Sequence, residues 1–150
     1  MAKPIYVLNG PNLNLLGSRE PEVYGKDTLD DVKAKCEAKA KALGFALDFR
    51  QSNHEGELVA WIQEARTEAA GLIVNAGAFT HSSIAMLDAL LATELPCVEV
   101  HLSNIFRRES FRHNSYISKG AKGVICGFGP LGYELAIEAL AASLEPKKAG

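Results

Sequence analysis

The chain of 150 residues is 47% hydrophobic and 23% charged, close to the average for globular proteins, which excludes a disordered or fibrous chain. Its net charge of -2, from 16 basic and 18 acidic residues spread along the sequence, argues against nucleic acid or an anionic membrane as a partner. We expect one domain over residues 1–150, with a flexible tail after about residue 145.

Cysteine usage and hydropathy both favour the cytoplasm. Cys36, Cys97 and Cys126 lie far apart in apolar segments without a CxxC pair, which predicts buried, reduced thiols. No apolar run approaches the roughly 18 residues of a membrane helix, and no signal-peptide layout is present. We therefore expect a cytoplasmic protein without a membrane segment.

Short apolar runs alternate with helical patterns along the chain. The runs predict buried strands at 5–9, 45–50, 71–75, 97–102 and 123–126. Alternating strands and helices favour right-handed crossovers and a parallel sheet with helices on both faces. The predicted fold class is therefore α/β, flavodoxin-like, with five strands in the order 2-1-3-4-5.

Four helices are predicted between and after these strands. The first begins at Thr28 with Asp31 as capping-box partner and ends at Gly44. The second starts near Glu57, the third at Ser82 or Ser83, and the fourth spans about 130–144. The faces expected to be buried comprise Leu29, Val32, Cys36, Ala40 and Leu43 in the first, Leu58, Trp61, Ile62 and Ala65 in the second, and Ile84, Leu87, Leu90 and Leu91 in the third.

The segment after the first strand is too long for an ordinary turn and has the features of a lid. It contains Arg19 and Tyr24. A tyrosine has an ordinary pKa near ~10 and is a poor base unless a positive charge stabilises its phenolate, and Arg19 can supply that charge. For an arbitrary loop, a packed tyrosine and a solvated arginine are the more common arrangement, so both interpretations stay open at this point.

Period-2 alternation in the fourth strand puts Glu99 and His101 on the same side. A buried carboxylate needs a partner, and Glu99 can orient the imidazole and favour its protonated form. This pairing suits His101 to act as a general acid, although a structural Glu-His pair is the alternative.

Two further loops follow strand ends. Residues 75–81 supply Asn75 and His81, which suit hydroxyl or anion binding but also cap helices. Residues 103–113 concentrate Arg107, Arg108 and Arg112, for which a solvated helix face or an RNA-binding patch is the alternative; the net negative charge argues against the second.

Neither a nucleotide nor a metal is expected. The sequence from Gly127 to Gly132 matches GxGxxG, but it follows the last strand, so no later strand can supply an acidic ribose ligand. The four histidines do not have zinc-ligand spacing.

Five motifs in this order resemble those of type II 3-dehydroquinate dehydratases. They are Gly-Pro-Asn-Leu-Asn-Leu-Leu-Gly-Ser-Arg-Glu-Pro with the following Tyr-Gly, Gln-Ser-Asn-His-Glu-Gly, Asn-Ala-Gly-Ala-Phe-Thr-His, Glu-Val-His-Leu-Ser-Asn, and Phe-Arg-His. The resemblance extends from Ile5 to about Leu140. Ala76 stands where some members have proline, and Leu102 where many have isoleucine.

The resemblance implies a lyase (EC 4.2.1.10) of the shikimate pathway that converts 3-dehydroquinate into 3-dehydroshikimate by stepwise anti elimination through an enolate, without cofactor or metal. Tyr24 would be the base, Arg19 would favour its phenolate, and Asn12 would hold a water that stabilises the enolate. His101, oriented by Glu99, would be the acid.

The same resemblance implies the substrate contacts and the assembly. Asn75, His81 and Arg112 would bind ring hydroxyls, while the backbone N–H groups of Leu102 and Ser103 and the Ser103 hydroxyl would bind the carboxylate. Arg108 would line the site. Asp88 would enter the site of a neighbouring subunit, because the resemblance implies a dodecamer built as four trimers.

Three other classes of protein are alternatives for a chain with this predicted fold. A flavin- or nucleotide-binding module would use the same strand ends, and a purely structural subunit would leave Tyr24, Arg19, Glu99 and His101 unexplained together. A phosphoacceptor regulator would require acidic residues at positions where this chain has Asn9, Asn12 and Asn75. Whether the pathway role is biosynthetic (chorismate and aromatic amino acids) or catabolic (quinate use) is left open.

Overall fold

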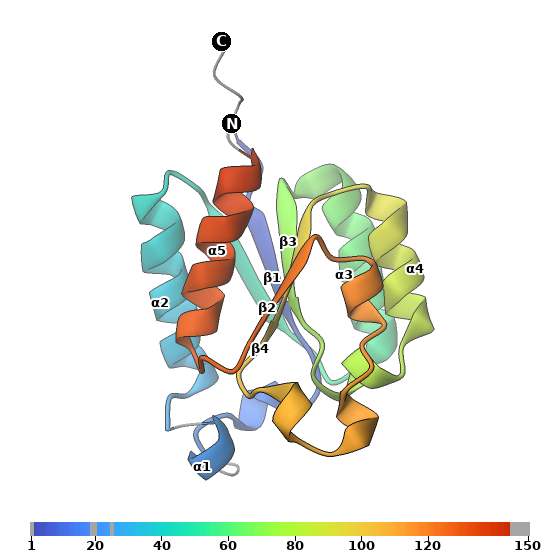
Figure 1. The fold of residues 1–150 in the computed structure, drawn as a ribbon. Helices are drawn as coiled ribbons and strands as arrows, with labels where there is room; N and C mark the ends of the chain where they lie inside the picture. The colour runs from blue at the N-terminus through green and yellow to red at the C-terminus, as the bar shows by residue number, and fades with distance from the viewer. Residues whose placement is uncertain (1, 19–20, 25, 145–150) are drawn as a thin grey trace.

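A parallel five-stranded sheet forms the centre of the computed structural model, which describes residues 2–18, 21–24 and 26–144, with only the backbone of Val23 and Tyr24. The strand order is β2-β1-β3-β4-β5, as predicted (Figure 1). The strands are β1 (Ile5–Asn9), β2 (Leu47–Gln51), β3 (Gly71–Asn75), β4 (Cys97–His101) and β5 (Gly123–Cys126). The helices are α1 (Pro21–Tyr24), α2 (Leu29–Ala42), α3 (Glu55–Glu68), α4 (Ile84–Thr93) and α5 (Leu131–Leu144).

Two strands, β2 and β4, have boundaries that differ from the prediction, for local hydrogen-bonding reasons. The backbone N–H of Phe45 donates to the Ala40 carbonyl at 2.8 Å and closes the end of α2, so Phe45 does not enter β2. Pairing with β1 carries β2 on to Gln51, opposite Asn9. At β4, the Leu102 carbonyl accepts from Gly129 at 3.0 Å and belongs to the following turn.

The predicted helix signals are found in the structure. Thr28 and Asp31 form a reciprocal capping box at the start of α2, and Gly44 follows its end with φ of +85°. Ser83 accepts a hydrogen bond from the Met86 N–H and caps α4. Helix α3 begins at Glu55, earlier than the Glu57 expected, because His54 already occupies its N-cap position.

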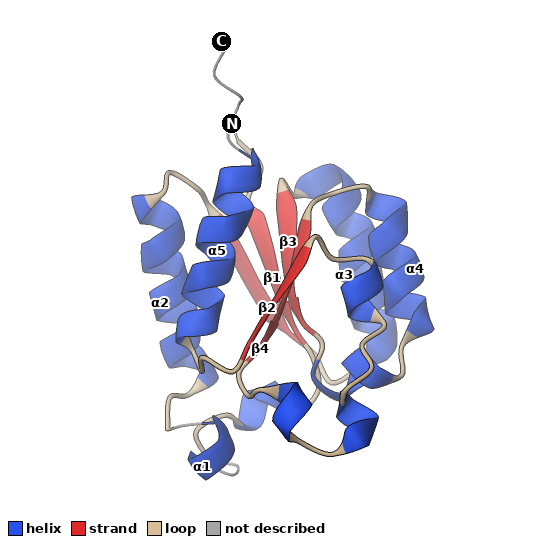
Figure 2. Cartoon of the chain, in the orientation of Figure 1, coloured by secondary structure: helices blue, strands red, loops and turns tan. Residues whose placement is uncertain are grey.

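The helices cover the sheet in two layers, α2 and α5 on one face and α3 and α4 on the other (Figure 2). Each face of the sheet carries one buried apolar cluster, and successive residues of β1, β3 and β4 point alternately into the two clusters. Ile5 and Val7 pack toward α2 and α5, and Tyr6 and Leu8 pack toward α3 and α4. Within the described residues no helix is long and apolar enough to cross a membrane.

Several residues predicted to be buried are exposed. Leu43 is 38% exposed because it is the C-cap of α2, and Ile84 and Leu91 are 54% and 56% exposed on the side of α4 turned away from the sheet. Strand β5 is an edge strand, so Val124 is 42% exposed and Cys126 is only half-buried, whereas Cys36 and Cys97 are buried as predicted. The predicted tail lies outside the described residues.

Candidate active site

A pocket opens at the carboxyl ends of the strands, where the loops after β1, β3 and β4 meet, as the topology predicts. The residues that line it are Pro11, Asn12, Leu13, Asn75, Gly77, Ala78, His81, His101, Leu102, Ser103, Ile105, Arg108 and Arg112. Eight of the predicted site residues named above are therefore brought together here: Asn12, Asn75, His81, His101, Leu102, Ser103, Arg108 and Arg112.

The loop after β1 is held by the segment after β2. The Asn12 N–H donates to Asn53 Oδ1 at 3.0 Å, and Gln51 Nε2 donates to the Gly10 carbonyl at 3.1 Å. Asn12 itself has a φ of 69°, in the left-handed region that asparagine tolerates better than most residues. Gln51 and Asn53 had no predicted role of their own, and only their place in one of the five motifs pointed to them.

The loops after β1 and β3 approach so closely that only glycine fits between them. The Gly10 N–H donates to the Asn75 carbonyl at 2.8 Å, and a Cβ on Gly10 would lie 2.2 Å from the Ala76 carbonyl oxygen. A Cβ on Gly77, whose φ is +58°, would lie 3.1 Å from the Pro11 carbonyl oxygen. This close approach sets the distance between Asn12 and Asn75.

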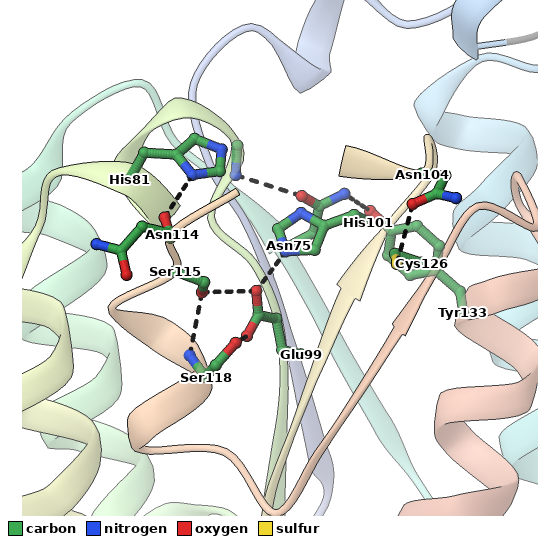
Figure 3. Close-up of polar contacts among 11 residues, drawn as sticks. Asn75, His81, Glu99, His101, Asn104, Asn114, Ser115, Ser118, Cys126 and Tyr133 are labelled. Carbon is green, nitrogen blue, oxygen red and sulfur yellow. Dashed lines mark hydrogen bonds and ion pairs between the residues drawn. The ribbon is translucent and has the colours of Figure 1, made fainter. Parts of the chain in front are cut away.

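His101 and Glu99 form a buried hydrogen-bonded pair at the end of β4, between His101 Nε2 and Glu99 Oε2 (Figure 3). The predicted pairing is thus present in the structure. Ser115 and Ser118 were not predicted, and their hydroxyls donate to the Glu99 carboxylate at 2.8 Å and 2.5 Å. Ser115 precedes η5 (Ile117–Lys119) and Ser118 lies within it, and only the fold brings this segment to β4.

These contacts keep Glu99 ionised. Burial on its own would raise the pKa of Glu99, but the hydrogen bond and charge of His101, with the hydrogen bonds of Ser118 and Ser115, outweigh it, and the pKa lies below its ordinary value. A carboxylate in this state accepts a hydrogen bond from Nε2 and so fixes the orientation of the imidazole. The second ring nitrogen, Nδ1, is then the atom through which His101 can exchange a proton with a ligand.

His81, at the end of η2 (Gly77–His81), has its ring orientation fixed by the backbone. Its Nδ1 lies 2.9 Å from the Asn114 carbonyl oxygen (Figure 3). Because a carbonyl oxygen only accepts, Nδ1 carries a hydrogen and the neutral ring offers Nε2 as an acceptor. His81 is therefore suited to accept a hydrogen bond from a hydroxyl group.

Asn75 is held by two contacts that leave it at the pocket wall. Its Nδ2 donates to the Tyr133 hydroxyl at 2.8 Å, and its Oδ1 accepts from the Gly77 N–H at 3.3 Å. Tyr133 lies on α5, far from β3 in sequence, and no sequence pattern points to it.

Positive charge comes from the turns η3 (Ile105–Arg107) and η4 (Ser110–Arg112). Arg108 Nη1 donates to the Ser103 hydroxyl at 3.3 Å, and Arg112 Nε donates to Glu109 at 3.0 Å. Arg107 is exposed and does not line the pocket. The pocket therefore combines two guanidinium groups with two imidazoles and two amides, a set suited to an anionic, hydroxylated ligand.

Besides Glu99, which contacts His101 but does not line the pocket, three of the predicted residues are not placed in this pocket. Arg19 lies outside the described residues, and Tyr24 ends α1 but its side chain is not described. Asp88 is exposed on α4 and does not line the pocket of its own chain. The roles of these three residues, like the roles of the predicted residues in the pocket, therefore stay predictions.

The GxGxxG segment forms the turn between β5 and α5, with φ of +96° at Gly127 and +61° at Gly129. These values agree with the tight turn expected there. Over the part of the chain that the structure describes, no three His, Cys, Asp or Glu side chains are grouped so that they could hold a metal ion.

Comparison with known proteins gives one consistent result. Residues 3–141 match the family model described as Dehydroquinase class II. A 3-dehydroquinate dehydratase of Phenylobacterium zucineum is 62% identical over 94% of this chain and 97% of its own length. 3-Dehydroquinate dehydratase 2 of Pseudomonas aeruginosa is 57% identical over 97% and 98% of the two chains.

Solved structures agree with these sequence matches. The type II dehydroquinase of Propionibacterium acnes superposes with a TM-score of 0.90 at 44% identity, over 95% of this chain and 98% of that chain. The type II dehydroquinase of Butyrivibrio crossotus also gives a TM-score of 0.90, at 40% identity, over 93% and 97% of the two chains.

Proposed function

The chain belongs to the class II dehydroquinase family, and from this membership and its pocket we propose that it dehydrates 3-dehydroquinate to 3-dehydroshikimate. The reaction removes a proton from C2, next to the C3 ketone, and the hydroxyl from C1. The observation that carries the proposal is the buried His101–Glu99 pair in a pocket that also contains two arginines and an asparagine. A flavin- or nucleotide-binding module would need no such proton donor.

The proposed mechanism is a stepwise anti elimination. Tyr24, as phenolate beside Arg19, takes the C2 proton, and the electron pair moves onto the ketone oxygen to give an enolate. A water held by Asn12 stabilises this oxyanion. The enolate then collapses, the C1–O bond breaks, and His101 protonates the departing hydroxyl, which leaves as water. The ketone is the electron sink, so we expect no cofactor, metal or lysine Schiff base.

Proposed substrate contacts follow from the pocket wall. His81 Nε2, Asn75 and Arg112 bind ring hydroxyls, and the backbone N–H groups of Leu102 and Ser103 with the Ser103 hydroxyl bind the carboxylate. The two guanidinium groups support this assignment because they favour an anionic substrate. Arg108, donating to the Ser103 hydroxyl, orients that group at the carboxylate end.

We also propose that the active form is a homo-oligomer, a dodecamer of four trimers, in which a second copy covers α4. Ile84, Asp88 and Leu91 are spaced to share one helix face, and both apolar members are more than half exposed. An apolar stripe around an acidic residue fits burial against another copy, with Asp88 reaching that copy's pocket. The expected cytoplasmic location and a place in the shikimate pathway remain proposals of the same kind.

The test is the ultraviolet absorbance that appears when 3-dehydroquinate becomes the conjugated enone 3-dehydroshikimate, measured with untreated enzyme and with a parallel sample of enzyme that was first treated with substrate and borohydride and then freed of both. We expect turnover in both samples, since no Schiff base is formed. Turnover abolished by borohydride would overturn the enolate mechanism, and no turnover by a folded oligomer would favour a binding module. Tyr24→Phe, which keeps the ring and removes the ionisable hydroxyl, should lose most of kcat.

A further inference from the structure

The hydroxyl of Tyr133 lies buried between two amides at the ends of neighbouring strands. It donates to Asn9 Oδ1 at 2.7 Å and accepts from Asn75 Nδ2 at 2.8 Å. Asn9 and Asn75 are the last residues of β1 and β3 and are paired in register, and Tyr133 and Asn9 are both fully buried. Figure 3 shows Tyr133 beside the amide of Asn75, on the side away from His81.

Asn9, Tyr133 and Asn75 form a series of hydrogen bonds, and the Asn9 end fixes the direction of each bond in it. Asn9 Nδ2 lies 3.0 Å from the Arg50 carbonyl oxygen, which can only accept, so Asn9 turns its own oxygen toward Tyr133. Tyr133 must therefore donate its single hydrogen to Asn9, and its oxygen is left to accept. Burial raises the pKa of Tyr133 well above its ordinary value, so the hydroxyl keeps this hydrogen.

The Asn75 end of this series of hydrogen bonds fixes the same direction. The Gly77 N–H, which can only donate, lies 3.3 Å from Asn75 Oδ1. A reversed Asn75 amide would put two donors together at Gly77 and two acceptors together at Tyr133, and both hydrogen bonds would be lost. Only one orientation of the Asn75 amide therefore gives a hydrogen-bond partner to the Gly77 N–H, to the Tyr133 hydroxyl and to both ends of the amide itself.

From this arrangement we propose that Tyr133 is a positioning residue, which fixes the amide orientation of Asn75 and thereby which hydrogen-bonding groups Asn75 offers to the substrate. Two contacts leave Asn75 with a second N–H on Nδ2 and a second lone pair on Oδ1. In the fixed orientation the substrate meets one pattern of donor and acceptor, and a reversed amide would exchange them. The inference rests on the proposed role of Asn75 in binding a ring hydroxyl.

The test compares two buried tyrosines. Tyr133→Phe removes the hydroxyl that orders Asn75, and we expect kcat/KM to fall about tenfold, the effect of one misdirected hydrogen bond. Tyr6→Phe is the matched control: Tyr6 is 3% exposed, and its hydroxyl donates to Glu64 at 2.5 Å, in the cluster on the other face of the sheet. We expect Tyr6→Phe to keep wild-type kcat/KM even if its Tm falls as much as that of Tyr133→Phe.

A double-mutant cycle with Asn75→Ala separates positioning from general stability. If Tyr133 acts through Asn75, the double variant has the same kcat/KM as Asn75→Ala alone. A further tenfold loss in the double variant, or unchanged kcat/KM in Tyr133→Phe beside an impaired Asn75→Ala, would overturn the inference. Full activity of Asn75→Ala would instead overturn the proposed role of Asn75 itself, and the inference with it.

A second variant covers the case in which Tyr133→Phe does not fold. Asn9→Ala keeps the Tyr133 hydroxyl but removes its acceptor, so the hydroxyl becomes free to donate to Asn75 and to permit the reversed amide. We expect a similar loss in kcat/KM, again absent in the Asn75→Ala background. Wild-type kcat/KM in Asn9→Ala would contradict the inference.

Discussion

His101 Nε2 is hydrogen-bonded to a carboxylate oxygen of Glu99, two residues earlier on the same strand, where β4 ends at the pocket. Both side chains are buried, and the remaining oxygen of Glu99 accepts from the Ser118 hydroxyl at 2.5 Å. The Ser118 hydroxyl fixes the Glu99 carboxylate, and the carboxylate in turn fixes the orientation of the His101 imidazole. This arrangement can deliver a proton in one direction, toward the pocket.

His101→Ala should lower kcat by about 10²- to 10⁴-fold, the usual contribution of a general acid. The chain should still fold, as circular dichroism and Tm would report. His54→Ala is the control, because His54 is exposed at the start of α3 and is absent from the pocket wall. Near-full turnover by His101→Ala would contradict the assignment of the acid.

Glu99 should make the stability of the fold depend on pH. Its pKa is lower in the folded chain than in the unfolded one, so its contribution is fully present above the unfolded pKa of about 4.3 and is lost as the pH falls through the folded value. Urea unfolding of the wild type and Glu99→Gln across the acidic range should show a free-energy difference that shrinks as the pH falls. A difference independent of pH would be inconsistent with an ionised Glu99.

Gly10→Ala should disturb the site through the backbone. The added Cβ would lie 2.2 Å from the Ala76 carbonyl oxygen, so the loops after β1 and β3 must move apart. We expect a loss of about 2 kcal/mol or more in the free energy of unfolding and a lower kcat/KM.

The control for this change is Gly56→Ala in α3, where an added Cβ meets nothing within 4 Å. It should be neutral or stabilising by up to about 1 kcal/mol, since alanine favours helix over glycine. Equal effects of the two substitutions would show that the close approach at Gly10 has no special weight.

Leu91→Glu should weaken the proposed assembly, because it introduces a charge into the apolar stripe on α4. Light scattering should then report a species smaller than the wild type. Leu43→Glu is the matched control at a 38% exposed leucine on α2, in the layer on the other face of the sheet. A wild type that is a stable monomer would rule out the oligomer.

Mixing two impaired variants tests whether Asp88 completes a neighbour's pocket. Asp88→Ala and Tyr24→Phe should each have low activity alone. Chains unfolded together and refolded as mixed oligomers should recover part of it, since some sites then combine an intact Tyr24 with an intact Asp88. Activity that never exceeds the sum of the two separate samples would argue against a shared site.

The sequence by itself determined the order of the elements and the position of the pocket. Alternation of short apolar runs with capped helices sufficed for the sheet order, because right-handed crossovers leave few topologies. The Glu99–His101 pair could also be predicted from the sequence, because residues two positions apart on a strand point to the same face of the sheet. The capping box at Thr28 is equally local, and it is present as predicted.

Only the tertiary structure decided what lies around these residues. Ser115, Ser118 and Tyr133 contact the site across long sequence separations, so no periodicity pointed to them. Exposure also depends on what packs nearby: Ile84 and Leu91 match an apolar helix pattern, yet the sheet covers only one side of α4. Local patterns are encoded by neighbours along the chain, whereas the partners of a buried polar group are set by which distant segments the fold brings together.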